Sequence, residues 1–339
     1  MHRVVWIASV LLLLFPAVFC AAYSKTYSNP VLVDTYHINR PEPARYVGTL
    51  GIGDPAVVLY KDKYYLYPTG DNHSYHVYIS DDLVHWSRGP KVFQSNENGV
   101  WAPDVFFNRA DGMFYLYYTA NGKIGVAEAD RPVGEFKNLG YLISKAIDAH
   151  MFRDDDGSYF LYFARYPDFG IFVQPMASPV RKKGEPIEVI SPSEAWEITN
   201  VPVTEAPWLL KHQGVYYLLY SGGSANTEHY AIGYATAQNP LGPFTKYPGN
   251  PIIREGGGVL GPGHGSVTRD REGKLWLVYH QQKDKTPGWN RVICIDSLWF
   301  DKKGVLHGKA TRATPRPAPV TAEKTGGAVR KCYNDHVVK

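Results

Sequence analysis

Five copies of one short pattern constrain this sequence more than any other feature. In each copy a polar lead residue, acidic in four cases and histidine in the fifth, stands at or near the start of an apolar segment. A short polar turn follows, and then a segment rich in aromatic residues. Turns of this kind between segments of alternating apolar residues predict β-hairpins. The lead residues are Asp54, Asp104, Asp148, Glu205 and His264.

The spacing of these hairpins predicts the fold class. The lead residues lie 44 to 59 residues apart, and further strand-like segments such as 75–80 and 232–237 fill the intervals. Repeats of this length with about four strands each are typical of propeller blades. The 25 tyrosines suit strands better than helices. We therefore expect an all-β protein, a five-bladed β-propeller over residues 46–320.

The N-terminal residues 1–22 have the features of a secretory signal peptide. A weakly basic start precedes the apolar residues 4–19, and small residues around Cys20 offer cleavage sites. The apolar segment is too short to predict a membrane span. We expect a secreted or periplasmic protein. A bacterial lipid anchor at Cys20 is the alternative, which the bulky Phe19 disfavours.

The rest of the composition limits the partners. The net charge of +4 and the scattered basic residues do not predict nucleic-acid binding. Residues 23–45 form a polar lead-in, and residues 321–339 form a short basic tail. Cys294 and Cys332 either form a disulfide in an oxidising compartment or Cys294 is a buried free thiol. The sequence does not predict the oligomeric state.

The lead residues are predicted to converge, because the first strand of each propeller blade lines the central channel. Carboxylates brought together from distant parts of a chain repel one another and cost stability, so their convergence indicates function. The apolar setting of Glu205, followed by Ala206, Pro207 and Trp208, adds to this. Burial raises the pKa of a carboxyl group, as a general acid at neutral pH requires.

Several segments together resemble family 43 of the glycoside hydrolases, five-bladed propellers with members that act on arabinans and xylans. The resemblance covers about residues 46–310, and its specificity comes from the order and spacing of the segments. The matching segments are Gly53–Pro55, Trp101–Asp104, Ile147–Asp148, Thr204–Trp208, Gly261–Ser266 and Asn290–Asp296.

The resemblance implies a role for each matching residue. Asp54 resembles the general base that activates water, and Glu205 resembles the general acid. Asp148 resembles the carboxylate that orients the acid and raises its pKa. Arg291 resembles the arginine that reaches the substrate or Asp148. His264 resembles an axial histidine associated with calcium and its waters. Direct metal binding by a histidine is the less expected arrangement because calcium prefers oxygen ligands, and a buried histidine without metal is the alternative.

Three more residues could contact the sugar. Trp101 and Trp208 could form aromatic walls of the sugar site, or they could pack in the core. Asp104 could contact a substrate hydroxyl or support the strand of the first blade. The chain departs from the family pattern after Asp148, where residues 149–150 are Ala-His and the family commonly has proline.

The predicted function is an inverting glycoside hydrolase that cleaves arabinose- or xylose-containing plant cell-wall polysaccharides or oligosaccharides. An α-L-arabinofuranosidase is the first expectation, and a β-xylosidase or endo-arabinanase of the same family is the alternative. Inversion is expected because Asp54 and Glu205 start the first and fourth blades, across the channel, and inverting enzymes need the wider carboxyl spacing.

Other classes fit the sequence less well. A non-catalytic carbohydrate-binding propeller would not need all three carboxylates. Repeated sialidase boxes do not occur, and the motifs of fructan hydrolases are absent from the corresponding positions. Exo or endo action stays open, as does the choice between arabinose and xylose.

Overall fold

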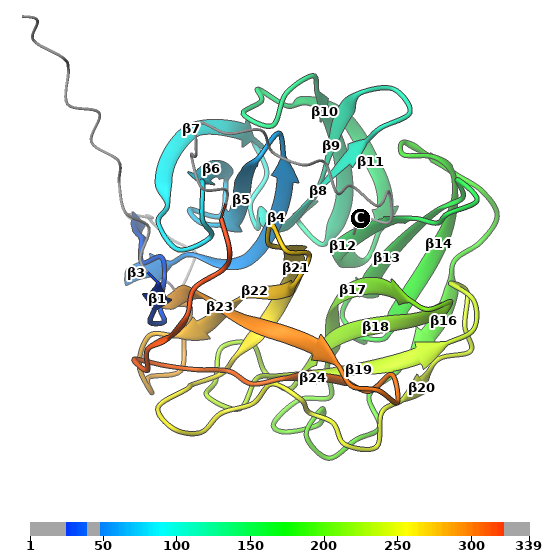
Figure 1. The fold of residues 1–339 in the computed structure, drawn as a ribbon. Coiled ribbons are helices and arrows are strands. Elements are labelled where there is room, and N and C mark those ends of the chain that lie inside the picture. Colours follow the sequence, from blue (N-terminus) through cyan, green and yellow to red (C-terminus); the bar gives the residue numbers. More distant parts are fainter. Residues whose placement is uncertain (1–24, 39–47, 322–339) are drawn as a thin grey trace, which may run out of the picture.

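Five antiparallel sheets surround a central axis in the computed structural model (Figure 1), which describes residues 25–38 and 48–321. The first blade contains β4 (Gly53–Tyr60), β5 (Lys63–Thr69), β6 (Ser74–Ser80) and β7 (Ser87–Gln94). The second contains β8 (Trp101–Asn108), β9 (Met113–Ala120), β10 (Lys123–Ala129) and β11 (Lys137–Ser144).

The third blade has a fifth strand. It contains β12 (Ala146–Arg153), β13 (Tyr159–Arg165), β14 (Ile171–Ser178), β15 (Arg181–Lys182) and β16 (Ile187–Ile190). The fourth contains β17 (Thr204–His212), β18 (Val215–Gly222), β19 (Ala231–Ala237) and β20 (Thr245–Lys246). The fifth contains β21 (Gly263–Arg269), β22 (Leu275–Gln282), β23 (Arg291–Phe300) and β24 (Leu306–Gly308). No helix occurs among the described residues, and the prediction of an all-β, five-bladed propeller is confirmed.

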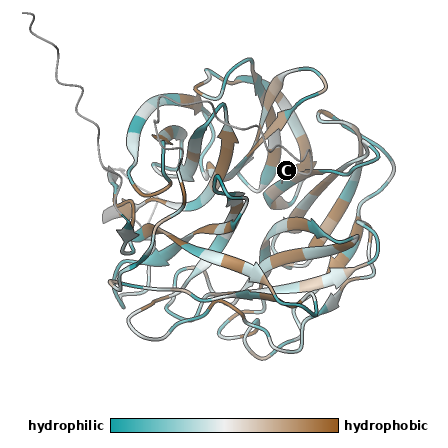
Figure 2. Ribbon diagram, viewed as in Figure 1, coloured by the Kyte–Doolittle hydropathy of each residue, from teal (hydrophilic) through white to brown (hydrophobic). Residues whose placement is uncertain are grey.

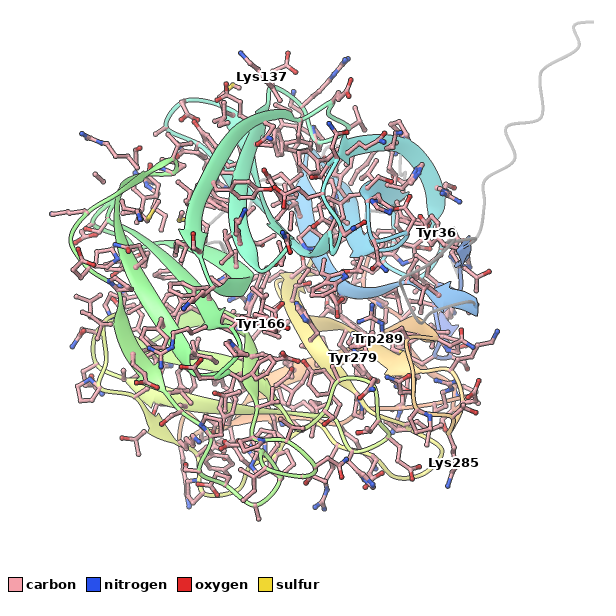
Figure 3. The ribbon with its side chains drawn as sticks, turned by 180° about the vertical axis from the view of Figure 1, so that it is seen from behind. Tyr36, Lys137, Tyr166, Tyr279, Lys285 and Trp289 are labelled. Carbon is pink, nitrogen blue, oxygen red and sulfur yellow. The ribbon has the colours of Figure 1, made fainter. Side chains whose placement is uncertain are left out.

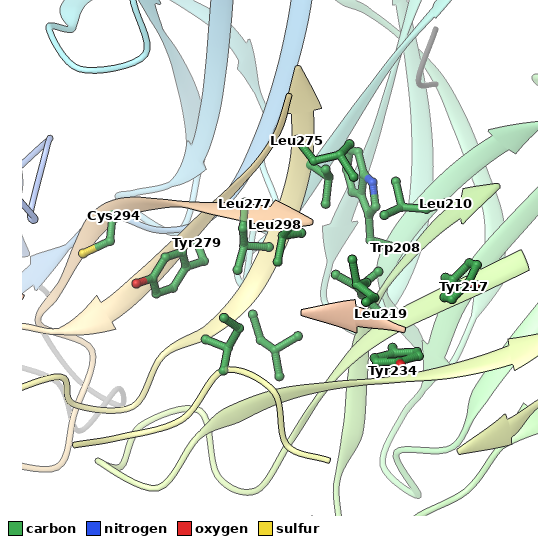
Figure 4. Close-up of a cluster of buried hydrophobic side chains, with 14 of the residues drawn as sticks. Trp208, Leu210, Tyr217, Leu219, Tyr234, Leu275, Leu277, Tyr279, Cys294 and Leu298 are labelled. Carbon is green, nitrogen blue, oxygen red and sulfur yellow. The ribbon is translucent and has the colours of Figure 1, made fainter. Parts of the chain in front are cut away.

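The hydrophobic core is divided into five clusters, one between each pair of neighbouring blades. Figure 2 shows hydrophobic residues mainly along the strands and hydrophilic residues mainly along the loops. The cluster between the fourth and fifth blades includes Leu210, Tyr217, Leu277 and Cys294 (Figure 4). Full burial of one such apolar side chain contributes about 1.5–3 kcal/mol. The alternating pattern of each strand therefore holds the ring together, because both faces of a blade pack against neighbours.

Each blade consists of consecutive strands, so among the described residues the first and fifth blades share no strand. The segment before the first blade packs instead on the fifth. There β1 (Thr26–Tyr27) pairs with β25 (Arg316–Pro317). The Asn29 side chain donates to Asp296 Oδ2 at 3.0 Å. A short hairpin of β2 (Thr35–Ile38) and β3 (Gly48–Gly51) then precedes β4.

Every innermost strand carries a β-bulge near its start, where the pairing with the second strand shifts register. One residue in each bulge, here called the bulge residue, has a left-handed φ of 44–58°. Asp and Asn tolerate this conformation better than most residues. The bulge residues are Asp54, Ala102, Asp148, Ala206 and His264. The residues before them, called pre-bulge residues, are Gly53, Trp101, Ile147, Glu205 and Gly263.

These bulges correct the predicted alignment of the repeats, in which all five lead residues have the same place. Of the five lead residues, only Asp54, Asp148 and His264 are bulge residues. Glu205 lies one residue earlier, and Asp104 lies two residues after the bulge residue of its strand. A bulge adds an unpaired residue to one strand of a pair, and the sequence does not show where this residue lies. The spacing of the repeats therefore does not reveal the offset of Glu205 and Asp104.

Some sequence predictions fall outside the described residues. These are the signal peptide, the lipid anchor at Cys20, residue Cys332 and the basic tail from residue 322 onward. Cys294 is a free thiol that is fully buried on β23. Within the part of the chain that is described, no helix is long and apolar enough to cross a membrane.

Candidate active site

The predicted base, Asp54, is surrounded by nitrogen atoms from the fifth blade. Its Oδ1 atom accepts a hydrogen bond from the Arg291 guanidinium at 2.6 Å and lies 3.3 Å from Nδ1 of His280. Nδ1 of His264 lies 3.4 Å from the same oxygen. The pre-bulge Gly53 makes this approach possible, because a Cβ atom there would lie 2.2 Å from the guanidinium carbon.

These neighbours keep Asp54 ionised. Burial acts to raise its pKa, but the charge of Arg291 and the two imidazoles hold the pKa well below its usual range. Asp54 is only 7% exposed. The result is a buried carboxylate that can accept a proton. Arg291 was predicted to reach the substrate or Asp148, and the structure places its guanidinium on Asp54.

The predicted acid, Glu205, lies in a different environment. Its Oε1 atom accepts a hydrogen bond from the Tyr230 hydroxyl at 2.7 Å, and the residue is 8% exposed. Burial raises the pKa of Glu205 to about 7; the negative charge of Asp54 adds to this, and the Tyr230 hydrogen bond opposes it. The carboxyl group therefore holds a proton near neutral pH, as a general acid must.

Asp148 is a neighbour of Glu205 in the electrostatics of the site. Burial and the negative charges of Glu205 and Asp54 raise the pKa of Asp148 well above its usual range. Its Oδ2 atom accepts the Ala206 backbone N–H at 3.2 Å. Two neighbouring buried carboxyl groups cannot both ionise easily, so the pair retains a proton at a pH where isolated carboxyls are ionised.

His264 links the two sides of the site. Its Nδ1 atom lies 3.4 Å from Oδ1 of Asp54 and 3.8 Å from Oδ2 of Asp148. Burial, opposed by the charge of Asp54, lowers its pKa to about 4. The imidazole is therefore neutral at pH 7.

Calcium at His264 stays a prediction. The carboxylates nearest to His264 are already engaged, Asp54 by Arg291 and Asp148 by the Ala206 N–H. Calcium takes six to eight oxygen ligands. Across residues 25–38 and 48–321, no group of three or more His, Cys, Asp or Glu side chains could hold a metal ion. The side chains of the described residues therefore do not by themselves form a calcium site.

Asp104 and Trp208 lie two residues beyond the bulge residues, in a layer further along the first strands. Oδ2 of Asp104 accepts the backbone N–H of Met151 at 2.7 Å and lies 3.5 Å from Nδ1 of His150. Asp104 therefore contacts the third blade, and the two sequence predictions, contact with a substrate hydroxyl or support of the first-blade strand, stay predictions. The Trp208 ring stacks on His150 with centroids 4.2 Å apart and is 7% exposed, in the cluster drawn in Figure 4.

Trp101 differs from Trp208 in being accessible. It is 39% exposed, and its indole N–H donates to Oδ1 of Asn72 at 2.8 Å. Two more aromatic residues, Tyr166 and Trp289, lie near the centre of the ring on loops of the third and fifth blades (Figure 3). Tyr166 is 41% exposed, and the Trp289 ring lies 5.3 Å from the Arg291 guanidinium.

Sequence reasoning missed two polar residues that contact the carboxylates, Tyr230 and His280. The Tyr230 ring occupies the space beside Gly263, where a Cβ atom would lie 1.9 Å from it. The glycine in the Gly-His-Gly motif was therefore a signal that a side chain approaches closely. His280 ends an otherwise apolar run in β22, so its polarity was the available signal.

Comparisons with known proteins identify the family of this chain. The glycosyl hydrolases family 43 profile matches residues 47–306. The chain is 30% identical over 286 residues to the β-D-galactofuranosidase xynD of Aspergillus niger, covering 75% of this chain and 81% of that protein. It is 28% identical to the xylosidase/arabinosidase 43A of Humicola insolens, covering 75% and 95%.

A solved structure shares the fold. The crystal structure of a thermostable family-43 glycoside hydrolase superposes with a TM-score of 0.77 at 34% identity, over 87% of this chain and 100% of that one. Other relatives carry the names of arabinofuranosidases and of an arabinanase. Inversion is characteristic of the family. The chain therefore belongs to family 43 of the glycosyl hydrolases.

Proposed function

We propose that the protein is an α-L-arabinofuranosidase acting on arabinose-containing plant cell-wall polysaccharides or oligosaccharides. The observation that carries the chemistry is the opposite tuning of two buried carboxyls. Arg291 keeps Asp54 ionised, whereas burial keeps Glu205 protonated up to about pH 7. An inverting hydrolase needs this combination of a base and an acid.

The proposed reaction is a single displacement. Asp54 takes a proton from a water molecule as its oxygen attacks the anomeric carbon, and Glu205 gives a proton to the glycosidic oxygen as the C–O bond breaks. Asp148 orients the acid, and the negative charge of Glu205 raises the pKa of Asp148, so the pair of carboxyl groups retains a proton. The carboxyls then exchange protons with solvent and return to their starting states. The released sugar has the opposite anomeric configuration.

The proposed sugar is a furanose. The β-D-galactofuranosidase from A. niger acts, by its name, on a furanoside, as do the arabinofuranosidases among the relatives. A β-D-galactofuranosyl ring and an α-L-arabinofuranosyl ring share their ring configuration and differ in the exocyclic carbon chain. The β-xylosidase alternative keeps the support of the xylosidase names.

A panel of matched aryl glycosides tests this proposal. We expect the highest kcat/KM for the α-L-arabinofuranoside, with lower values for the β-D-galactofuranoside and the β-D-xylopyranoside. Proton NMR of the first product should show the inverted anomer. A preference for the xyloside would transfer the assignment to β-xylosidase. Retention would exclude the roles given to Asp54 and Glu205.

We also propose that the protein is exported. Two Streptomyces relatives carry the word extracellular in their names. The basic start, the apolar residues 4–19 and the small residues after them support cleavage between residues 20 and 23. N-terminal sequencing of protein from the culture medium or periplasm should find this new terminus. An intact Met1 on exported protein would contradict the proposal.

A further inference from the structure

One hydrogen bond recurs between neighbouring blades beside the site. On the second strand of each blade, one residue pairs with the pre-bulge residue of the first strand and lies next to the bulge of the following blade. We call this the latch position. Its five occupants are Thr69, Thr119, Ala164, Ser221 and His280.

At four of the five latch positions, the side chain accepts a hydrogen bond from the following blade. In each, the backbone N–H of a bulge residue donates to the latch residue of the preceding blade, at 2.7–3.2 Å. The donor and acceptor pairs are Ala102 to Thr69, Asp148 to Thr119, His264 to Ser221 and Asp54 to His280. The hydroxyl or imidazole satisfies a buried amide that the bulge removes from the regular ladder.

The latch between the third and fourth blades is different. Ala164 occupies the latch position there, and its methyl group cannot accept a hydrogen bond. The bulge amide of Ala206 donates instead to Oδ2 of Asp148, at 3.2 Å. Asp148 thus accepts the hydrogen bond that a latch oxygen accepts between the other blades. The donor, Ala206, directly follows Glu205, the predicted acid.

Hydroxyl groups are buried at three of the equivalent positions. Ala164 is fully buried, but so are the corresponding residues Thr69, Thr119 and Ser221, which are at most 2% exposed. Their environments accommodate a hydroxyl group. A hydroxyl at residue 164 would compete with Asp148 for the Ala206 amide, because one N–H makes one good hydrogen bond.

We propose that Ala164 is a positioning residue. Its side chain cannot accept a hydrogen bond from the Ala206 N–H, so this N–H donates to Asp148 and holds the carboxyl group beside Glu205. The inference rests on the proposed roles of Glu205 and Asp148. The second group beside Oδ2 of Asp148, Nδ1 of His264, lies 3.8 Å away, beyond hydrogen-bond distance. The Ala206 amide is therefore the donor that holds Oδ2 of Asp148 in place.

The test compares Ala164→Thr with Ala164→Val, which have the same shape and differ in the hydroxyl group. With Ala164→Thr, we expect kcat to fall by about 10- to 100-fold on substrates with poor leaving groups, as small misplacements of reacting groups can cause. Substrates with good leaving groups should lose much less, because they need little protonation. KM should change little. Ala164→Val should keep the leaving-group dependence of the parent enzyme.

Further variants keep the test decisive. Ala164→Ser adds a single oxygen and should reproduce the Thr effect if the larger side chain prevents folding. Equal losses in Thr and Val, or a parent-like Ser variant, would overturn the proposal. Glu205→Ala is measured in parallel. If its activity does not depend on the leaving group, the acid assignment itself fails; if it does, equal losses in Thr and Val contradict only the latch.

Discussion

Asp54 and Glu205 are buried to nearly the same extent, at 7% and 8% exposure, yet their acidities move in opposite directions. Asp54 faces a guanidinium and two imidazoles from the fifth blade. Glu205 accepts a hydrogen bond from the neutral hydroxyl of Tyr230, and its negative charge raises the pKa of the neighbouring Asp148. Burial raises the pKa of both groups, and only at Asp54 do the neighbouring groups reverse the direction of the shift. One channel can therefore hold a base and an acid at the same pH.

Replacing Asp54, the proposed base, should have the largest effect. Asp54→Ala should reduce kcat by about 10²–10⁴-fold on every substrate, because activation of water is needed whatever the leaving group. Steady-state rates on aryl glycosides of graded leaving-group pKa measure this. A loss confined to poor leaving groups would mean that Asp54 acts as the acid.

Replacing the acid should give a smaller and more selective effect. Glu205→Ala should lose about 10²–10⁴-fold on poor leaving groups and much less on good ones, because good leaving groups depart with little protonation. The slope of log kcat against leaving-group pKa should become steeper than in the parent enzyme. An unchanged slope would remove Glu205 from the acid role.

Removing the cation should bring the two carboxyls closer in acidity. In the proposed mechanism Asp54 acts in its ionised form, so activity should rise as the pH increases through its pKa. Arg291→Met should raise that pKa and move the acidic limb of the kcat/KM profile to higher pH. Arg291→Lys keeps the charge and should move the limb less. An acidic limb at the parent position in the Met variant would show that Arg291 does not tune Asp54.

The smallest expected effect concerns the Tyr230 hydroxyl. In the proposed mechanism Glu205 acts in its protonated form, so activity should fall as the pH rises through its pKa of about 7. The hydroxyl stabilises the ionised carboxylate, and Tyr230→Phe should therefore raise this pKa and shift the alkaline limb to higher pH. Tyr217→Phe, which removes a hydroxyl that donates to the Gly304 carbonyl, is the matched control. A shift to lower pH in Tyr230→Phe would contradict the assignment.

The sequence was sufficient for the fold because each hairpin is encoded locally. A polar turn between two apolar strands is visible in consecutive residues, and five copies define the ring. The partners of the carboxylates were not visible in this way. Arg291 lies 237 residues from Asp54, and Tyr230 lies in no recognised motif. Such contacts depend on how the blades face one another, which local patterns do not specify.

The two tryptophans of the predicted sugar site show a finer limit. Trp101 precedes an Ala-Pro pair, whereas Trp208 follows one. The alanine is the bulge residue in both strands, so the tryptophans lie on opposite sides of the same bulge. Trp101 is 39% exposed, and Trp208 packs into a core cluster. Similar letters in a different order therefore lead to different environments.

Because each blade consists of consecutive strands, the ribosome synthesises the blades one after another. Asp54 leaves the ribosome early, but its partner Arg291 is synthesised 237 residues later. At about 5–20 residues per second, this delay is roughly 10–50 s. Throughout it the nascent chain carries an aspartate without its cation. Hydrolytic competence therefore arrives with the last blade, and translation that stops earlier yields a chain without an intact base.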